Sequence, residues 1–381
     1  MVAAFPFPSP QGSQVLVRGL SRRLVERGHE VALLTYGQGQ HVDGEGYEHH
    51  RIRRLPGDDA MRSGPTPTKP LLDALMLTKL TALLRERPFD IIHAHNYEAA
   101  VVGLLARMRT GVPVVYHSHN LMGDELETYF VTPTGRVLAR RLGGWLDRNV
   151  PRRATHTIAL CEPSAAEMRD RLGVDPRRLS VIPPVVDVLG DPRPTGADAP
   201  GDGSLRVVYC GNTDAYQDLD VLVQAAVRLD GEEPPVTVVV GTHGTDRSFA
   251  SRAREAGAGR VLEVVGLESS AQAAALIASA DVAVLPRGAG SGYPIKLLNY
   301  MSAAKAVVTA GCGAKLVRHG IDGLVVPDDD PDALVEAFRR LRDAPEERRR
   351  LGAEGHRTWR ERLSWEATLP EIERAYEQAL T

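Results

Sequence analysis

Two short runs decide the fold of this chain: DIIHAHN at Asp90–Asn96 and PVVYHSHN at Pro113–Asn120. Each is apolar over the length of a strand and then ends in histidine and asparagine. A strand that is apolar without alternation is buried on both faces, as in a parallel sheet covered by helices on both sides. We therefore predict an α/β layer in which these two runs are neighbouring strands.

The rest of the first half repeats this pattern. Further apolar runs of strand length lie at Val31–Tyr36, His156–Glu162 and Leu179–Pro184. Amphipathic stretches of helical length lie at Ser13–Gly28, Leu71–Arg87 and Arg136–Asn149. Met1–Pro6 resembles the second half of a buried strand and not a signal peptide, so we expect a true start a few residues upstream.

A segment rich in proline, glycine and aspartate then interrupts the pattern, which restarts after it. We expect strands at Leu205–Gly211, Val236–Gly241, Val261–Gly266, Asp281–Arg287, Ala306–Gly311 and Leu324–Pro327. We expect helices at Asp218–Leu229, Ala271–Ser279, Pro294–Ala303, Pro331–Arg342 and Trp365–Leu380. The predicted fold class is α/β, with two doubly wound parallel-sheet domains that face a central cleft. The first domain comprises residues 1–186 and the second comprises residues 205–363, with a linker over 187–204. A final helix over 364–381 packs back on the first domain.

Composition excludes several classes of protein. Of the 381 residues, 43% are hydrophobic and 25% are charged, which is typical of a globular enzyme and not of a disordered chain. The net charge of −3 gives no field for nucleic acid, and no apolar run is long enough to span a membrane. The chain has only three cysteines, at positions 161, 210 and 312, and they lie far apart. We therefore expect no disulfide framework and a cytoplasmic location.

Histidines end both of the deciding strands. His93 and His95, and likewise His117 and His119, are two residues apart and so point to one face of the sheet. Two such pairs are able to hold Zn²⁺, but position 120 is asparagine where a common hydrolase set would have aspartate. We predict that at least one of these histidines touches substrate and that the protein binds no metal.

Two glycine-containing turns lead into helices. Gly12 and Ser13 open the first helix, where free N–H groups attract anions or sugar hydroxyls, although a plain capped turn would look the same. The second turn is GSGYPIKLLNYM at Gly290–Met301, with Pro294 at the expected first helical position and Lys296 beside it. We interpret it as a diphosphate-binding turn, against the alternative of a capped helix with a surface lysine.

The stretch Arg136–Arg148 combines arginines with apolar residues at helical spacing. Two interpretations remain open. The helix lies on an anionic membrane, or it has a solvated basic face with Leu138, Leu142 and Trp145 in the core.

In order and spacing, these pieces resemble the family-four glycosyltransferases of the GT-B fold. The segments that carry the resemblance are PFPSPQGSQ, FDIIHAHN, GVPVVYHSHN, VVYCGNTDAYQDLDVL, SGYPIKLLNYMSAAKAVV and HGIDGLVVPDDDPDAL. The resemblance implies that a nucleotide-diphosphate sugar, most often a UDP-sugar, binds the C-terminal domain and an acceptor binds the N-terminal domain. It also implies transfer to an acceptor hydroxyl with retention at the anomeric carbon, without a divalent metal or other cofactor.

The resemblance also assigns residues. His119 matches the histidine beside the donor sugar and the acceptor, and is the expected catalytic residue. The expected donor-binding residues are Gly12, Ser13, Gly211, Asn212, Gln217, Gly266 in a loop, Arg287, Ser291, Gly292, Tyr293, Pro294, Lys296 and Asn299. On the acceptor side we expect His95, His117, Asn120, Asp124 and Glu125, with Asp58–Lys69 and Met122–Phe130 as acceptor loops; the two acidic residues fit a solvated loop equally well.

Several positions depart from the family pattern. Ser291 and Asn299 replace two glutamates, and Asn212 and Gln217 stand where the family has arginine and lysine. We hypothesise a compensating set of Asn212, Gln217, Lys296 and Asn299, with added charge from Arg287. The departures also keep open a nucleotide-sugar epimerase and a catalytically weak nucleotide-sugar-binding protein, followed by a glycosyl phosphorylase and a zinc hydrolase.

Overall fold

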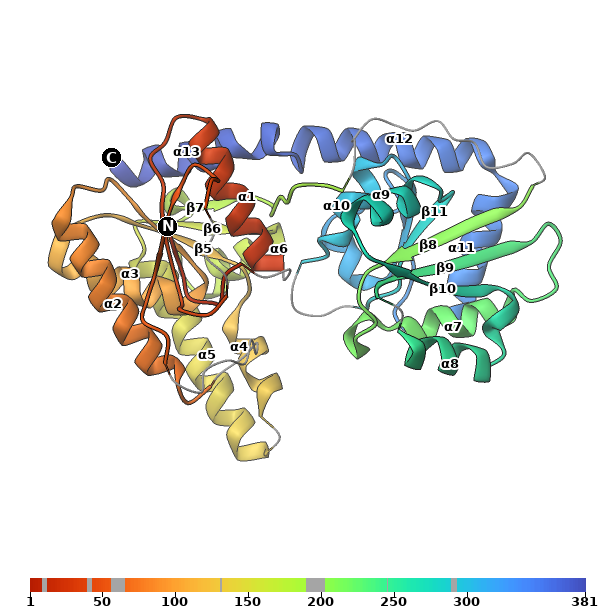
Figure 1. Ribbon diagram of the computed structural model, residues 1–381, viewed down its shortest axis with the longest axis horizontal. Coiled ribbons are helices and arrows are strands. Elements are labelled where there is room, and N and C mark those ends of the chain that lie inside the picture. The colour runs from red at the N-terminus through yellow and green to blue at the C-terminus, as the bar shows by residue number, and fades with distance from the viewer. Residues whose placement is uncertain are drawn as a thin grey trace. The chain divides into compact units, whose positions relative to one another are not determined.

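A computed structural model describes residues 1–8, 12–39, 43–55, 66–130, 132–189, 203–244, 246–288 and 293–381. The chain divides into two compact units. Unit 1 comprises Met1–Val186 and Trp365–Thr381, and unit 2 comprises Asp187–Ser364. Each unit is a parallel sheet with helices on both faces (Figure 1), so the predicted α/β class is confirmed. Most of the predicted linker lies outside the described residues.

Unit 1 has a seven-stranded sheet in the order β3-β2-β1-β4-β5-β6-β7, and all of its pairings are parallel. Its strands are β1 Val2–Ala3, β2 Ala32–Thr35, β3 Glu48–Arg51, β4 Ile92–His95, β5 Val114–Ser118, β6 His156–Ala159 and β7 Leu179–Val181. Its α-helices are α1 Gly12–Glu26, α2 Lys69–Glu86, α3 Asn96–Thr110, α4 Met122–Glu125, α5 Pro133–Arg153, α6 Glu162–Ala166 and α13 Trp365–Leu380.

Different helices cover the two faces of this sheet. Leu20 of α1 and Ile372 of α13 pack on one face together with Val115 of β5. A Cβ at Gly19 would lie 2.6 Å from the Trp365 ring, so glycine lets α13 approach α1 closely. The opposite face carries α2 and α3. Because side chains alternate along a strand, β5 turns His117 to the same face as Val115.

Unit 2 has a six-stranded parallel sheet in the order β10-β9-β8-β11-β12-β13. Its strands are β8 Leu205–Cys210, β9 Val236–His243, β10 Leu262–Leu267, β11 Val282–Leu285, β12 Ala306–Thr309 and β13 Leu324–Val325. Its α-helices are α7 Leu219–Arg228, α8 Arg247–Glu255, α9 Ser270–Ala278, α10 Lys296–Ser302, α11 Pro331–Asp343 and α12 Pro345–Arg362. The central strands are almost wholly apolar and buried, as expected for a sheet covered on both faces.

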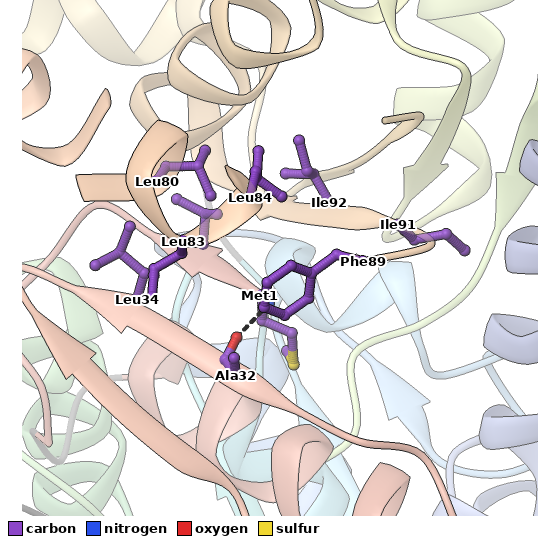
Figure 2. Close-up of a pocket in the computed structure, with 10 residues that line it drawn as sticks. Met1, Ala32, Leu34, Leu80, Leu83, Leu84, Phe89, Ile91 and Ile92 are labelled. Atoms are coloured by element: carbon purple, nitrogen blue, oxygen red, sulfur yellow. Dashed lines mark hydrogen bonds between the residues drawn. The ribbon is translucent and has the colours of Figure 1, made fainter. Parts of the chain in front are cut away.

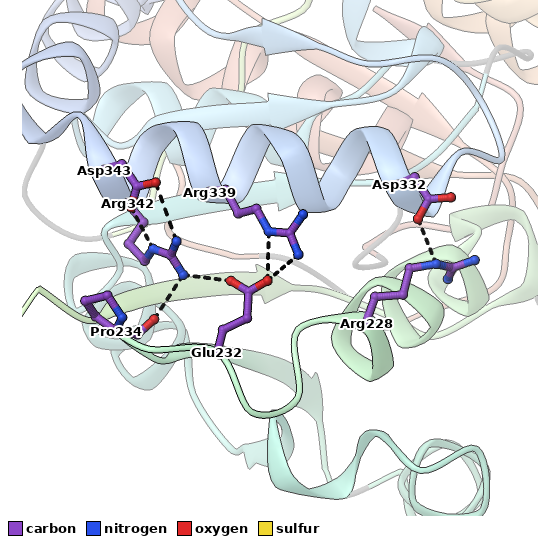
Figure 3. A network of polar contacts seen from close by, with 7 residues as sticks. All are labelled: Arg228, Glu232, Pro234, Asp332, Arg339, Arg342 and Asp343. Carbon is purple, nitrogen blue, oxygen red and sulfur yellow. Dashed lines mark hydrogen bonds and ion pairs between the residues drawn. The ribbon is translucent and has the colours of Figure 1, made fainter.

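Ion pairs hold α11 in place at the surface of unit 2 (Figure 3). Both Arg339 and Arg342 pair with the carboxylate of Glu232, in the turn before β9. Arg228 of α7 lies 2.8 Å from Asp332 at the first turn of α11. An exposed pair such as Arg228–Asp332 contributes little, so the packing of α11 also depends on its buried apolar side.

Two local predictions need correction. Helix α10 begins at Lys296, so Pro294 is not its first residue. The reason is a tighter entry, in which the N–H groups of Leu297 and Leu298 donate to carbonyls three residues earlier. Gly266 does not lie in a loop, because it pairs with Thr242 within β10, an edge strand of the sheet.

A third correction concerns α5. Leu138, Leu142 and Trp145 do not lie in the core, because they are 69%, 52% and 58% exposed. The buried side of α5 instead presents Ala139, Gly143, Asp147, Val150 and Pro151. None of the described helices is long and apolar enough to cross a membrane.

Candidate active site

Four histidines gather at the carboxyl ends of β4 and β5; we call them the histidine ladder (His93, His95, His117 and His119). The pairing of His95 with His117 across the two strands brings the rings together. His93 Nε2 lies 3.2 Å from His117 Nδ1, and His95 Nδ1 lies 3.2 Å from His119 Nε2. Ligands of open parallel sheets bind outside this end of the strands, so the ladder marks the expected site of unit 1.

The ladder is neutral at physiological pH. All four rings are buried, and burial lowers the pKa of His119 to about 4. The pKa values of His93, His95 and His117 lie well below the usual range for the same reason, with a smaller contribution from neighbouring charge. Neutral imidazoles both donate and accept hydrogen bonds, which suits recognition of hydroxyl groups.

The first turn of α1 joins the ladder. Ser13 Oγ lies 2.9 Å from His119 Nδ1, and α1 begins at Gly12. The structure thus brings Ser13, His119 and His95 into one hydrogen-bonded chain, although they are far apart in sequence. At the other end of the ladder, the Tyr376 hydroxyl lies 2.7 Å from His93 Nδ1.

The ladder resembles a metal site only in part. Ring nitrogens of His93, His95 and His117 lie within 4.8 Å of one another. However, both nitrogens of His93 already have polar partners, at Tyr376 and His117. Among the described residues, only Nε2 of His95 and Nε2 of His117 are buried ladder atoms without a partner. Two free nitrogens are fewer than the three or four ligands of ordinary zinc sites.

The predicted acceptor side continues after β5. The Asn120 carbonyl accepts a hydrogen bond from the Ser118 hydroxyl, and the Asn120 side chain is half-buried. Asp124 and Glu125 lie in α4, and their side chains are outside the described residues. The acceptor loop predicted at Asp58–Lys69 lies mostly outside them as well.

Two residues that support this side were not predicted. Buried Asp147 of α5 accepts hydrogen bonds from the N–H groups of Met122 at 2.8 Å and Gly123 at 2.7 Å, and from the Tyr97 hydroxyl. It therefore fixes the start of α4. No local sequence motif points to Asp147 or Tyr376. The only sequence feature that could have indicated Asp147 is its position as a single acidic residue on a basic helix.

In unit 2, Lys296 lies against the end of β8. A Cβ at Gly211 would lie 1.9 Å from Lys296 Cε, so glycine there makes room for the lysine. The ammonium lies 5.7 Å from the centre of the Tyr209 ring. Burial, and then the charge of Arg287, lower the pKa of Lys296 to about 8. Lys296 forms no ion pair with any described residue, and the charge of Asp214 has only a small effect on its pKa.

Asn212 and Gln217 form a network beside this lysine. Asn212 Nδ2 donates to Asp214 at 2.6 Å and to the Tyr216 hydroxyl at 3.0 Å. Gln217 Nε2 donates to Asn212 Oδ1 at 2.8 Å. Arg287 stacks over the Tyr216 ring at 5.1 Å from its centre. Tyr216 and Asp214 were not predicted, although both lie within the quoted GNTDAYQDLDVL segment.

The structure describes some of the remaining residues predicted to bind the donor, and not others. Asn299 Oδ1 accepts a 2.8 Å hydrogen bond from the Leu189 N–H, which leaves its two N–H donors and one acceptor lone pair. The Tyr293 carbonyl accepts from the Ile295 N–H in the turn before α10. Ser291 and Gly292 lie outside the described residues.

One pocket of unit 1 lies away from the histidine ladder. Figure 2 shows a small apolar cavity lined by Met1, Leu34, Leu80, Phe89 and Ile92, among others. Met1 and Ile92 stand at the amino ends of β1 and β4, the opposite edge from the histidine ladder. This cavity therefore belongs to the packing of the sheet and not to the site.

Comparison with known proteins first defines a class. A sucrose-phosphate synthase from Thermosynechococcus elongatus superposes with a TM-score of 0.79 at 18% identity, covering 99% of this chain and 98% of that one. Anabaena HepE in complex with UDP and glucose superposes with a TM-score of 0.73 at 15% identity, covering 99% and 98%. At these identities the likeness shows the fold, which is that of the GT-B glycosyltransferases.

Sequence comparison then gives the family. Glycosyltransferase Family 4 matches residues 10–188, and Glycosyl transferases group 1 matches residues 204–343. The chain is 28% identical to a D-inositol 3-phosphate glycosyltransferase of Geodermatophilus obscurus, over 97% of this chain and 85% of that protein. It is 28% identical to an MMP alpha-(1->4)-mannosyltransferase of Mycolicibacterium hassiacum, over 97% and 95%. The chain belongs to the family-four glycosyltransferases of the GT-B fold, which confirms the resemblance seen in its sequence.

Proposed function

We propose that this glycosyltransferase moves a hexose or an N-acetylhexosamine from a nucleotide-diphosphate sugar to a hydroxyl group of its acceptor, with retention at the anomeric carbon. A UDP-sugar is the first donor to test, because HepE is solved in complex with UDP and with UDP-glucose. The acceptor is a small molecule, a glycan or a lipid-linked compound. D-inositol 3-phosphate is the first acceptor to test, since several relatives are named for it.

The observation that carries the donor assignment is buried Lys296. Its ammonium lacks an ionic partner among the described residues, and Arg287 adds a second positive charge nearby. Two cations near the carboxyl end of β8 would attract a diphosphate and stabilise the charge that develops on it as the sugar leaves. They would serve in place of the arginine and lysine that the family has at positions 212 and 217.

The neighbouring amides have a supporting role in this proposal. Asn212 and Gln217 hold the Tyr216 ring under Arg287 through their hydrogen bonds. Asn299 joins the linker to α10 through Leu189 and offers its two amide N–H donors to the nucleotide. The compensating set is thus one cationic residue supported by three amides.

On the acceptor side, His119 is the proposed catalytic residue. It is neutral at pH 7 and already oriented by Ser13 and His95, so it is ready to hydrogen-bond a sugar hydroxyl. The transfer requires no divalent metal in this proposal, because the protein supplies the positive charge. The three cysteines are free, which fits the reducing cytosol as the place of the reaction.

The test is a thermal-shift screen with UDP, GDP, ADP and TDP and their sugars, with and without EDTA. Selective stabilisation by one nucleotide sugar that persists in EDTA supports the donor site. Incubation of that donor with D-inositol 3-phosphate and other polyols, followed by NMR of the product, then gives the anomeric configuration.

Each alternative predicts a different outcome. An isomerised nucleotide sugar formed without acceptor would indicate an epimerase, and turnover that needs inorganic phosphate would indicate a phosphorylase. Stabilisation without any product would indicate a binding protein. An absence of stabilisation by every nucleotide would overturn the proposed donor site.

A further inference from the structure

Helix α5 of unit 1 exposes an apolar stripe, formed by Leu138, Leu142 and Trp145. These residues follow one another at i, i+4 and i+7 and therefore lie along one side of the helix. Each is more than half exposed. Single exposed apolar residues are ordinary, but a continuous stripe that contains tryptophan is typical of a surface that meets a partner.

Arginines run beside this stripe. Arg141 is one turn from both Leu138 and Trp145, and Arg148 and Arg152 follow at spacings that keep them on the same side. All three are exposed, and none forms a hydrogen bond or an ion pair with any described residue. The partner of the stripe must therefore supply negative charge as well as apolar contact.

The opposite side of α5 fixes the helix in the fold. Asp147 is buried and binds the backbone of Met122 and Gly123, and a Cβ at Gly143 would lie 2.4 Å from the Met122 carbonyl. Val150 is buried in the apolar cluster around α2 and α3. Since these contacts hold the helix in one orientation, the stripe cannot turn inward, and it remains presented to the outside of unit 1.

A second copy of the chain fits this surface poorly. Asp147 is the one acidic residue in α5, and it is buried. Two copies joined stripe to stripe would bring arginines against arginines without acids to pair them. A bilayer with anionic headgroups supplies phosphates at the depth of the arginines and an apolar layer for the leucines and the tryptophan.

We propose that α5 is a docking surface that holds the enzyme on an anionic lipid bilayer, with Leu138, Leu142 and Trp145 inserted at the interface and Arg141, Arg148 and Arg152 on lipid phosphates. The surface faces away from the buried contacts of the helix and does not depend on the identity of the donor. Its function is to place the enzyme at a membrane surface.

The test is co-sedimentation of the full-length protein with sucrose-loaded vesicles. One set contains phosphatidylcholine with about one-third phosphatidylglycerol, and the other contains phosphatidylcholine alone. The expected result is binding to the anionic vesicles only, with weaker binding as salt is added. The double variant Arg141→Gln/Arg148→Gln should bind the anionic vesicles about tenfold more weakly than the wild type does.

Matched variants separate this surface from bulk charge and apolar exposure. Arg360→Gln/Arg362→Gln removes the same charge from exposed positions of α12 and should bind as the wild type does. Leu142→Ala/Trp145→Ala should lose about tenfold in binding, because it removes inserted apolar area. All of the substituted α5 residues are exposed, so circular dichroism should show that the variants fold as the wild type does.

Three results would overturn the proposal. The first is the absence of binding to anionic vesicles. The second is binding that the α5 variants and the Arg360→Gln/Arg362→Gln control weaken equally. The third is a dimer in light scattering that Leu142→Ala/Trp145→Ala converts to a monomer while vesicle binding stays unchanged, which would assign the stripe to a second copy of the chain.

Discussion

The carboxyl ends of the two sheets carry opposite kinds of chemistry on the same architecture. In unit 1 the site consists of four buried, neutral histidines joined by hydrogen bonds. In unit 2 it consists of a buried lysine and an arginine held by aromatic rings and amides. The fold places both sites, while the residues at the strand ends decide what each binds.

This difference assigns the two substrates in our account. A neutral ladder has donors and acceptors for hydroxyl groups but has no charge for a diphosphate. A buried cation without a partner attracts an anion strongly, because little water screens it. Four predictions test this contrast, beginning with the largest effect.

The first prediction is that acid destabilises unit 1 and not unit 2. The ladder histidines and His156 have folded-state pKa values below their unfolded values, so the unfolded chain binds more protons below the unfolded pKa of about 6.5. Stability is therefore lost as pH falls from about 6.5 toward about 4, at about 1.4 kcal/mol per histidine for each pH unit. The histidines of unit 2 (His243, His319 and His356) are not buried.

Peptide-resolved hydrogen exchange of the full chain at pH 7.5 and 5.5, corrected for the intrinsic exchange rate, measures this difference. Protection should fall at pH 5.5 in the strands of unit 1 and persist in those of unit 2. Equal loss in both units would contradict a ladder that is neutral when folded.

The second prediction is that His119→Ala lowers kcat by about 100-fold, because in our proposal this residue contacts the reacting sugar and the acceptor. The dissociation constant for UDP should change less than twofold, because the proposed UDP site lies in unit 2. His29→Ala, at an exposed histidine paired with Glu373, is the control. If His119→Ala weakens UDP binding and leaves kcat intact, the assignment of the two sites is wrong.

The third prediction is that Gly211→Ala weakens UDP binding about tenfold, because the added Cβ displaces Lys296. Isothermal titration should show little further loss when Gly211→Ala is combined with Lys296→Ala, since both remove the same interaction. Gly144→Ala, where a Cβ meets open space, is the control. Additive losses in the double variant would mean that Gly211 acts independently of Lys296.

The smallest predicted effect is that of Ser13→Ala. It removes the hydrogen bond to His119 and should lower kcat/KM about fivefold, with no change in folding. Ser13→Thr, which keeps a hydroxyl, should restore most of the activity. An unchanged rate in Ser13→Ala would show that His119 needs no orientation from α1.

The sequence was sufficient to predict the fold because buried parallel strands leave continuous apolar runs, and both HxH strands lie where we expected them. It also led to His119, Ser13 and Lys296, since strand ends and helix starts are local features. The structure gives the contacts of these residues, and their predicted chemistry stays a prediction.

Other features depended on contacts between distant segments. Edge strand β3 has the polar sequence EHHR, and α12 is strongly charged, so neither has a clear apolar pattern. Tyr376 and Leu189 reach the site regions from remote parts of the chain, which no local motif reports. The sequence left open whether the apolar side of α5 lies in the core, because periodicity identifies an apolar face but not what covers it.

The most direct test of the central claim is the dissociation constant for UDP from pH 7 to 9.5 in EDTA, for the wild type, Lys296→Ala and Lys305→Ala. Lys305 is also a buried lysine of unit 2, but its ammonium donates to the Ala278 carbonyl. Because the pKa of Lys296 is about 8 in the free protein, wild-type affinity should fall as pH rises above about 8. Lys296→Ala should bind UDP about tenfold more weakly at pH 7, and its affinity should not fall further as pH rises. Lys305→Ala should behave as the wild type does. A Lys296→Ala variant that binds UDP as tightly as the wild type, with the same pH dependence, would contradict the account.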